Sequence, residues 1–98
     1  MDKNTYTITT SSGFSYEVDN DAFDDMEIFD DLMIMEDPEA SQAKRLNATN
    51  RVFRKMIGAE QQKKLDAFLK ERDGKIRISA YQQEIKELFS GLDNNKKK

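Results

Sequence analysis

The sequence predicts a small α+β domain that is mainly helical, with an N-terminal β-hairpin followed by about four α-helices. Apolar residues alternate within residues 5–18 and recur at helical spacing later, and turn residues separate these segments. With 98 residues, of which 37% are hydrophobic and 36% charged, the chain is long enough for one domain with a thin core. We expect this domain to span residues 1–92 and a disordered basic tail to follow at residues 93–98.

Residues 5–18 have the alternation of two half-buried strands. Tyr6 and Ile8 alternate with threonines in the first strand, and the second strand alternates in the same way. Residues 11–13, which read Ser-Ser-Gly, supply the turn. Because a lone hairpin is only marginally stable in water, we expect its apolar face to pack against the helices.

The segment from Asp19 to Asp37 interleaves acids with large apolar residues. The apolar residues recur at steps of three and four and form a wide face, and the acids form its polar edge. Acidic capping residues place the start of this helix near Asp21, and Pro38 places its end near Glu36. The protein's own core could use this whole face, or part of it could be left for a partner. The sequence leaves both possibilities open.

Three further helices are expected after this segment. The first spans residues 39–57 and ends at Gly58, and the second runs from residue 59 or 60 to residue 72. A short extended connector comes next. Ser79, with a glutamine three residues later, has the pattern of a capping box and begins the last helix, which Gly91 ends.

The net charge of −3 conceals a division along the chain. Residues 1–39 carry one lysine and twelve acidic residues, whereas residues 40–98 carry fifteen basic and seven acidic residues. The simpler interpretation is that the two halves fold against each other and partly neutralise. The alternative is that one of them attracts a partner of opposite charge. A nucleic-acid-binding regulatory protein would use the basic cluster in the second helix, although the acids upstream oppose that function. This cluster consists of Lys44, Arg45, Arg51, Arg54 and Lys55.

The residue types exclude much of catalysis and metal chemistry. Without cysteine or histidine, the chain has no disulfide, no thiolate nucleophile and no sulfur or imidazole metal ligand. The acidic segment does not fit a calcium loop, because Phe23 and Asp24 occupy positions that need an oxygen ligand and a glycine. We therefore expect no enzyme activity, no metal and no cofactor. The sequence also contains neither a signal-peptide pattern nor a membrane-spanning apolar run, so we expect a cytoplasmic protein without a membrane partner.

The order of five short segments carries a family resemblance. The segments are Ser12-Gly13-Phe14, the acidic pattern Asp19–Leu32, Ile57-Gly58-Ala59-Glu60-Gln61, Asp73-Gly74-Lys75-Ile76 and Glu84–Phe89. Together they resemble the small tail assembly chaperones of long-tailed siphophages and related prophages, over residues 5–92. The basic segment 41–55 departs from the family, because it is longer than in the shorter members.

The resemblance implies a non-enzymatic protein of the bacterial host cytoplasm that coats the helical tape measure protein. The chaperone would keep that protein soluble until tail tube subunits polymerise around it, and would be absent from the mature virion. The tail tube protein and a longer, frameshifted form of the chain are further partners that the resemblance implies, and a homo-oligomer remains open. The candidate contacts are Met26, Phe29, Met33, Tyr81, Ile85 and Phe89, which could equally be core residues.

Overall fold

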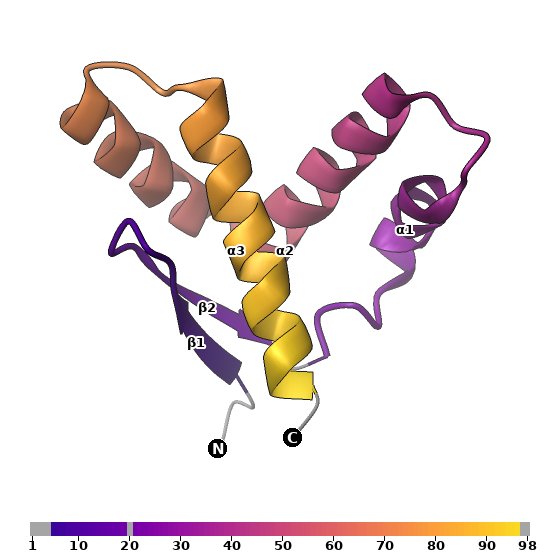
Figure 1. Ribbon diagram of the computed structural model, residues 1–98. Helices are drawn as coiled ribbons and strands as arrows, with labels where there is room; N and C mark the ends of the chain where they lie inside the picture. Colours follow the sequence, from indigo (N-terminus) through magenta and orange to yellow (C-terminus); the bar gives the residue numbers. More distant parts are fainter. Residues whose placement is uncertain (1–4, 20, 97–98) are drawn as a thin grey trace.

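The computed structural model describes residues 5–19 and 21–96, and it shows a mainly helical chain with a two-stranded hairpin at its start (Figure 1). The elements are β1 (Thr5–Thr9), β2 (Ser15–Asp19), a 3₁₀ turn (Met26–Ile28), α1 (Phe29–Glu36), α2 (Gln42–Asp73) and α3 (Ile78–Lys96). The described residues thus form three α-helices, whereas the sequence predicted about four. None of these helices is long and apolar enough to cross a membrane.

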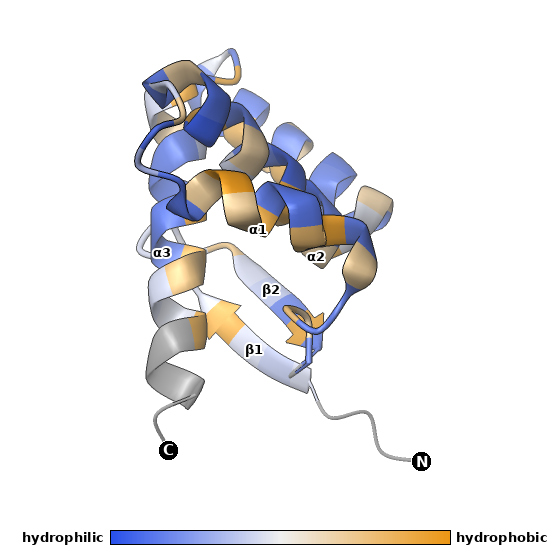
Figure 2. Ribbon diagram, turned by 90° about the vertical axis from the view of Figure 1, so that its right-hand side faces the viewer, coloured by the Kyte–Doolittle hydropathy of each residue, from blue (hydrophilic) through white to orange (hydrophobic). Residues whose placement is uncertain are grey.

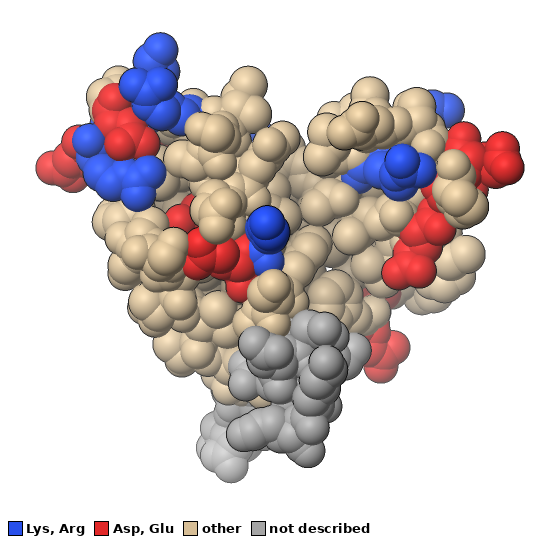
Figure 3. Space-filling view, in the orientation of Figure 1, with Lys and Arg blue, Asp and Glu red and all other residues tan. Residues whose placement is uncertain are grey.

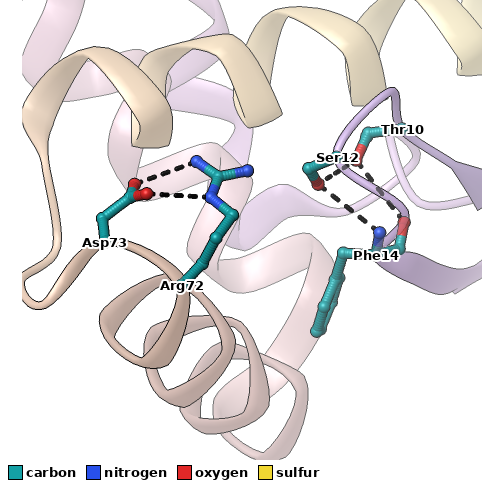
Figure 4. Close-up of polar contacts among 5 residues, drawn as sticks. All are labelled: Thr10, Ser12, Phe14, Arg72 and Asp73. Carbon is teal, nitrogen blue, oxygen red and sulfur yellow. Dashed lines mark hydrogen bonds and ion pairs between the residues drawn. The ribbon is translucent and has the colours of Figure 1, made fainter.

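β1 and β2 pair antiparallel, as the alternation predicted. Ile8 lies opposite Tyr16, so both side chains share the face that packs on the helices. The loop between the strands closes when the Thr10 N–H donates to the Phe14 carbonyl at 3.0 Å. The Ser12 hydroxyl lies inside this loop, 3.0 Å from the Thr10 hydroxyl and 3.4 Å from the Phe14 N–H (Figure 4).

The predicted interruption at Gly58 is a sharp bend within α2 rather than a loop between two helices. Gly58 has φ 80° and ψ 163°, and the two straight halves of α2 diverge from it as a V (Figure 1). The Gln61 side chain fills the bend, because its Nε2 donates to the Ile57 carbonyl at 2.7 Å and to the Glu17 carbonyl at 2.9 Å. Its Oε1 accepts from the Glu17 N–H at 2.8 Å. One side chain therefore joins the bend to the edge of β2.

The hydrophobic core lies between the hairpin, α2 and α3. It consists of Ile8, Tyr16, Val18, Phe53, Ile57, Leu65, Leu69, Ile85, Leu88 and Leu92. α1 adds nothing to it: α1 has the most hydrophobic sequence of the three α-helices (Figure 2), yet it contains no buried residue. Among the described residues of the acidic segment, only Ile28 is buried, and it lies in the 3₁₀ turn before α1. The acidic segment therefore leaves most of its apolar face outside the core.

The prediction that the first helix begins near Asp21 is wrong. Residues 21–23 form a turn, Asp25 is extended, and α1 begins only at Phe29. The Asp25 side chain accepts a hydrogen bond from the Glu27 N–H at 2.9 Å and so caps the short 3₁₀ turn. Aspartate competes for nearby backbone N–H groups in non-helical conformations, and a run of such residues therefore delays the helix.

Both predicted ends of the last helix are also wrong. α3 begins at Ile78, and the Tyr81 N–H already donates to the Arg77 carbonyl, so the expected capping serine lies inside the first turn. α3 then passes through Gly91 to Lys96. A Cβ atom at Gly91 would lie 2.8 Å from the Cγ2 atom of Ile8, so this glycine permits the close approach of α3 to β1. Residues 97–98 of the expected tail lie outside the described residues.

Two glutamates, three residues apart on α3, hold the hairpin. Glu84 is 2% exposed, and its Oε1 accepts from the Tyr16 hydroxyl at 2.7 Å and from the Thr10 hydroxyl at 2.8 Å. Burial, and then the hydrogen bond to Glu84, raise the pKa of Tyr16. Glu87 accepts from the N–H and the hydroxyl of Ser11 at 2.6 and 2.7 Å.

Glu87 should make the stability of the fold sensitive to acid. Its hydrogen bonds from Gln83 and then Ser11 lower its pKa below the ordinary value of 4.5. A group whose pKa is lower in the folded state stabilises the fold above its unfolded pKa, and that contribution disappears as the pH falls through the folded pKa. We expect the stability difference between the parent and Glu87→Gln to shrink as the pH falls from neutral to below about 4. Urea unfolding at a series of pH values measures it.

The control for this experiment is Glu71→Gln, which removes an exposed glutamate from α2. Its stability difference from the parent should be small and change little over the same range. Equal pH dependence of the two variants would contradict a role for the contacts of Glu87 with Ser11 and Gln83.

Candidate functional site

The exposed large apolar side chains of the described residues gather along one groove. They are Met26, Phe29, Met33, Leu46, Ile76 and Ile78, and all but Met26 border it. The groove consists of two adjoining clefts of about 680 and 810 Å³, which share Lys86 and Phe89. Contiguous exposed apolar patches often mark interaction surfaces, whereas single exposed apolar residues are common on any protein.

The first cleft lies between the first half of α2 and the start of α3. Leu46 and Asn50 line it from α2, and Ile76, Ile78 and Tyr81 line it from the opposite side. In Figure 3 it is the hollow between the two lobes, where the surface is mostly uncharged and basic side chains lie on both sides. One lobe contains the first half of α2, and the other contains the second half of α2 with α3 (Figure 1). The cleft lies inside the bend of α2, because Gln62 and Asp66 from the second half also line it.

The second cleft continues the groove between α1 and α3. α1 contributes Phe29, Leu32, Met33 and Met35, and α3 contributes Phe89. Methionine side chains are flexible and polarizable, and they suit a surface that must accept partners of variable shape. The apolar face of α1 that the core leaves exposed is therefore one wall of the groove.

The structure brings together five of the six predicted contacts. Phe29, Met33 and Phe89 line the second cleft, and Tyr81, Ile85 and Phe89 line the first. Ile85 is only 8% exposed and belongs to the core. Met26, the sixth predicted contact, lies in the 3₁₀ turn; it is 80% exposed but borders neither cleft.

Core packing holds the floor of the first cleft in place. The Tyr81 ring packs edge-on against Phe53 at 5.6 Å, and Phe53 packs in the same way against Tyr16 at 5.9 Å. The Tyr81 hydroxyl and the Asn50 Oδ1 are buried and have no hydrogen-bond partner among the described residues. The floor of the first cleft thus rests on the aromatic core, and two buried polar atoms lie beneath it.

Sequence reasoning missed one wall of the groove. Leu46 reads as an ordinary member of an apolar helix face, and residues 75–78 read as a connector. The available signal was the alternation of basic and apolar residues in that connector, Lys-Ile-Arg-Ile, which is unusual for a polar loop. The bend of α2 places these residues opposite each other, and no local pattern reports the direction of that bend.

Ion pairs attach the acidic segment to the basic helix. Arg51 donates twice to Asp31, at 3.0 and 2.8 Å, and Lys55 donates to Glu27 at 2.6 Å. These hydrogen bonds raise the pKa of Arg51 and the pKa of Lys55. The interpretation that the acidic and basic halves of the chain fold against each other is confirmed for these residues.

The same contacts occupy much of the basic cluster. A third member, Arg45, donates from Nη1 to the backbone carbonyls of Asp37 and Ala40, at 3.0 and 2.8 Å. Arg54 faces the first cleft, and Lys44 borders a separate hollow beside α1. The basic side chains therefore serve several internal contacts and do not form one unpaired stripe along α2.

The groove differs in composition from the acidic surface of the segment before it. The groove is lined mainly by apolar, amide and basic side chains. Within the described part of the chain, no three acidic side chains are grouped so that they could hold a metal ion. Comparison of the chain with protein-family models, with curated proteins and with solved structures gave no match.

Proposed function

We propose that this chain is a non-enzymatic phage tail assembly chaperone that binds the tape measure protein in the groove. One observation carries the proposal: α1 is the most hydrophobic helix and buries no residue, and its exposed apolar side chains line the groove together with α3. A groove of this kind accepts the apolar face of an amphipathic helix. The proposal also rests on the sequence resemblance to tail assembly chaperones.

The physical properties of the groove suit a temporary partner. It is open and partly polar, and one of its walls is attached by surface ion pairs, so a bound helix could be displaced when tail tube subunits arrive. Several copies along one tape measure would strengthen binding through avidity. The proposal places the chain in the bacterial host cytoplasm and outside the mature virion. The tail tube protein and a frameshifted longer form belong to it as further partners.

The alternative, a nucleic-acid-binding regulator, has less support. Phosphate contacts need basic side chains that are free to meet the backbone of the nucleic acid. Here Arg51 and Lys55 pair with acids of the same chain, and Arg45 bonds backbone carbonyls. Salt-sensitive binding of DNA or RNA to the purified chain, with no binding of a tape measure protein, would nevertheless favour this alternative.

Co-expression with the tape measure protein of the same genome tests the proposal. We expect that protein to become soluble and to co-purify with the chain, also at high salt. Phe29→Asp and Ile78→Asp should each reduce the co-purified amount by about tenfold or more, because they place a charge in the apolar contact. Both positions are exposed at the start of a helix, where an acid is tolerated.

Met26→Asp is the matched control, because Met26 is exposed and apolar but borders neither cleft. It should co-purify like the parent. Circular dichroism must show that all three variants are folded. If the tape measure protein stays insoluble, or if Met26→Asp loses it as completely as Ile78→Asp, the proposed function or its location in the groove is wrong.

A further inference from the structure

The groove is basic, although the chain as a whole is acidic. Arg54, Arg77 and Lys86 line it, against Asp66 in the first cleft and Glu36 in the second. Among the side chains that the structure describes, none of the three basic ones forms an ion pair, whereas the basic residues of the three observed ion pairs lie elsewhere. The groove therefore has three basic and two acidic side chains on its walls, a net charge of +1.

Two acids outside the groove that interact with its basic residues are already engaged. Asp73, which lies close enough to Arg77 for its pKa to respond, receives two hydrogen bonds from Arg72 at 3.1 and 3.0 Å (Figure 4). Those bonds from Arg72 are the main reason that the pKa of Asp73 is lowered. Glu87, beside Lys86, is held by its hydrogen bonds from the hairpin loop. These bonds hold both acids outside the groove, although the charge of Glu87 still acts on Lys86.

The basic side chains alternate with the exposed apolar ones. Arg77 lies between Ile76 and Ile78 in sequence, and Lys86 is shared by both clefts beside Phe89. Long basic side chains can lie along an apolar surface and keep their charged ends in water. The complementary ligand is a helix with an apolar stripe and acidic residues on both sides of it.

Building on the proposed function, we infer that the groove selects amphipathic helices whose apolar stripe is flanked by acidic residues. Arg54 and Arg77 would meet the acids along the first cleft, and Lys86 those near the second. Charges at the edge of an interface act mainly on specificity and on the rate of association. The groove would thus distinguish among the helical segments of a long partner by their charge.

A second copy of this chain is a weaker candidate for the occupant. Its α1 is itself acidic and apolar, but Asp31 already pairs with Arg51, and Glu27 in the preceding turn pairs with Lys55. To dock into a neighbour's groove in a new orientation, α1 would have to give up contacts that join it to α2. A separate partner helix could bind without breaking the contacts between α1 and α2.

Two synthetic peptides of about 18 residues, long enough for several helical turns, test the inference. Both carry the same leucine stripe at helical spacing; one is flanked by glutamates and the other by lysines. Titrated into the full chain at low salt, the glutamate peptide should bind about tenfold more tightly, as expected for three surface charge pairs. Added salt should reduce this preference and leave apolar binding in place.

Charge reversal supplies the matched variants. Arg54→Glu, Arg77→Glu and Lys86→Glu together should remove or invert the preference for the glutamate peptide. The control variant replaces three other lysines with glutamate: Lys63, Lys64 and Lys70. They are exposed on the second half of α2 and line neither cleft of the groove. It changes the net charge equally and should keep the preference. If both triples act alike, the effect is one of net charge and the inference fails.

The outcomes separate this inference from the proposed function. Equal binding of both peptides overturns the inference, even if the tape measure protein co-purifies and Ile78→Asp loses it. Selective binding of the glutamate peptide supports the inference, even if no tape measure protein co-purifies. Sedimentation of the chain alone covers the remaining case: a dimer that Ile78→Asp dissociates would show that a second copy fills the groove, and the inference would be wrong.

Discussion

Replacing Gly58 with alanine is expected to lower the free energy of unfolding by about 2 kcal/mol, although alanine is the better helix former. Gly58 has φ 80° and ψ 163°, a backbone region that residues with a Cβ atom rarely occupy. No atom lies within 4 Å of the position that the new methyl group would take. The loss would therefore come from backbone conformation rather than from a clash. Urea unfolding of the two proteins measures it.

Whether Gly58→Ala lowers or raises the free energy of unfolding distinguishes a bent α2 from a straight one. In a regular helix, the same change would stabilise the protein by about 1 kcal/mol. Ala67→Gly, at an exposed position in the straight second half of α2, measures that helix-propensity contribution in this protein. If Gly58→Ala is instead more stable than the parent by a similar amount, α2 is straight at this point. X-ray scattering would then also show a different radius of gyration from the 13.7 Å of the bent chain.

Replacing Glu84 with alanine should lower the free energy of unfolding by about 3 kcal/mol. Glu84 is 2% exposed and accepts hydrogen bonds from Tyr16 and Thr10, so its removal takes the acceptor from the buried Tyr16 hydroxyl and one of the partners from the Thr10 hydroxyl. It also leaves a cavity where α3 meets the hairpin. Loss of this magnitude is a large part of the stability of a domain of this size. Thermal and urea unfolding of the purified variant test the expectation.

Two further variants identify the cause. Glu84→Gln keeps an acceptor oxygen and nearly the same volume, so it should lose less than half as much as the alanine variant. Tyr16→Phe, combined with Glu84→Ala in a double-mutant cycle, should cause less additional loss than it does alone, because its hydrogen-bond partner is already gone. Additive losses would mean that the hydrogen bond between Tyr16 and Glu84 contributes nothing of its own.

Local patterns in the sequence were sufficient for the hairpin and for the interruption of α2. The alternation around Ile8 and Tyr16 depends only on the pleat of a strand, and it placed both residues on the buried face correctly. Gly58 stands out because a glycine interrupts a long apolar periodicity. In both cases the deciding interactions lie within a few residues of each other, so the sequence contains them.

Helix ends were harder to predict, because the chain offers several competing signals. Asp21 and Asp25 are both good capping residues, and the one that caps is followed by Ile28, which is buried where the 3₁₀ turn contacts α2. Gly91 resembles a helix stop, but it lies inside α3 where Ile8 of the distant β1 strand passes. Such contacts join residues that are far apart in sequence, and local propensity does not report them.

The candidate site was likewise predictable only where local patterns determine it. The sequence identified Phe29 and Met33 as members of an apolar face, but it could not say whether the core would use that face. The core formed instead between α2, α3 and the hairpin, where Ile85 was needed for packing. Ile76 and Ile78 became part of the groove only because of the bend in α2. Whether an apolar residue is buried or left for a partner is decided by competition among all the faces of the chain.

The attachment of α1 has a consequence for how the groove responds to salt. Ile28 is buried, but the ion pairs Arg51–Asp31 and Lys55–Glu27 lie at the surface. Surface pairs are weak and are screened by salt, so added salt should weaken the attachment of α1 to α2 and leave it to Ile28 and the half-buried apolar residues of α1. The wall of the groove that α1 forms should therefore respond to salt, whereas the wall that α3 forms is anchored in the core by Ile85 and Leu88.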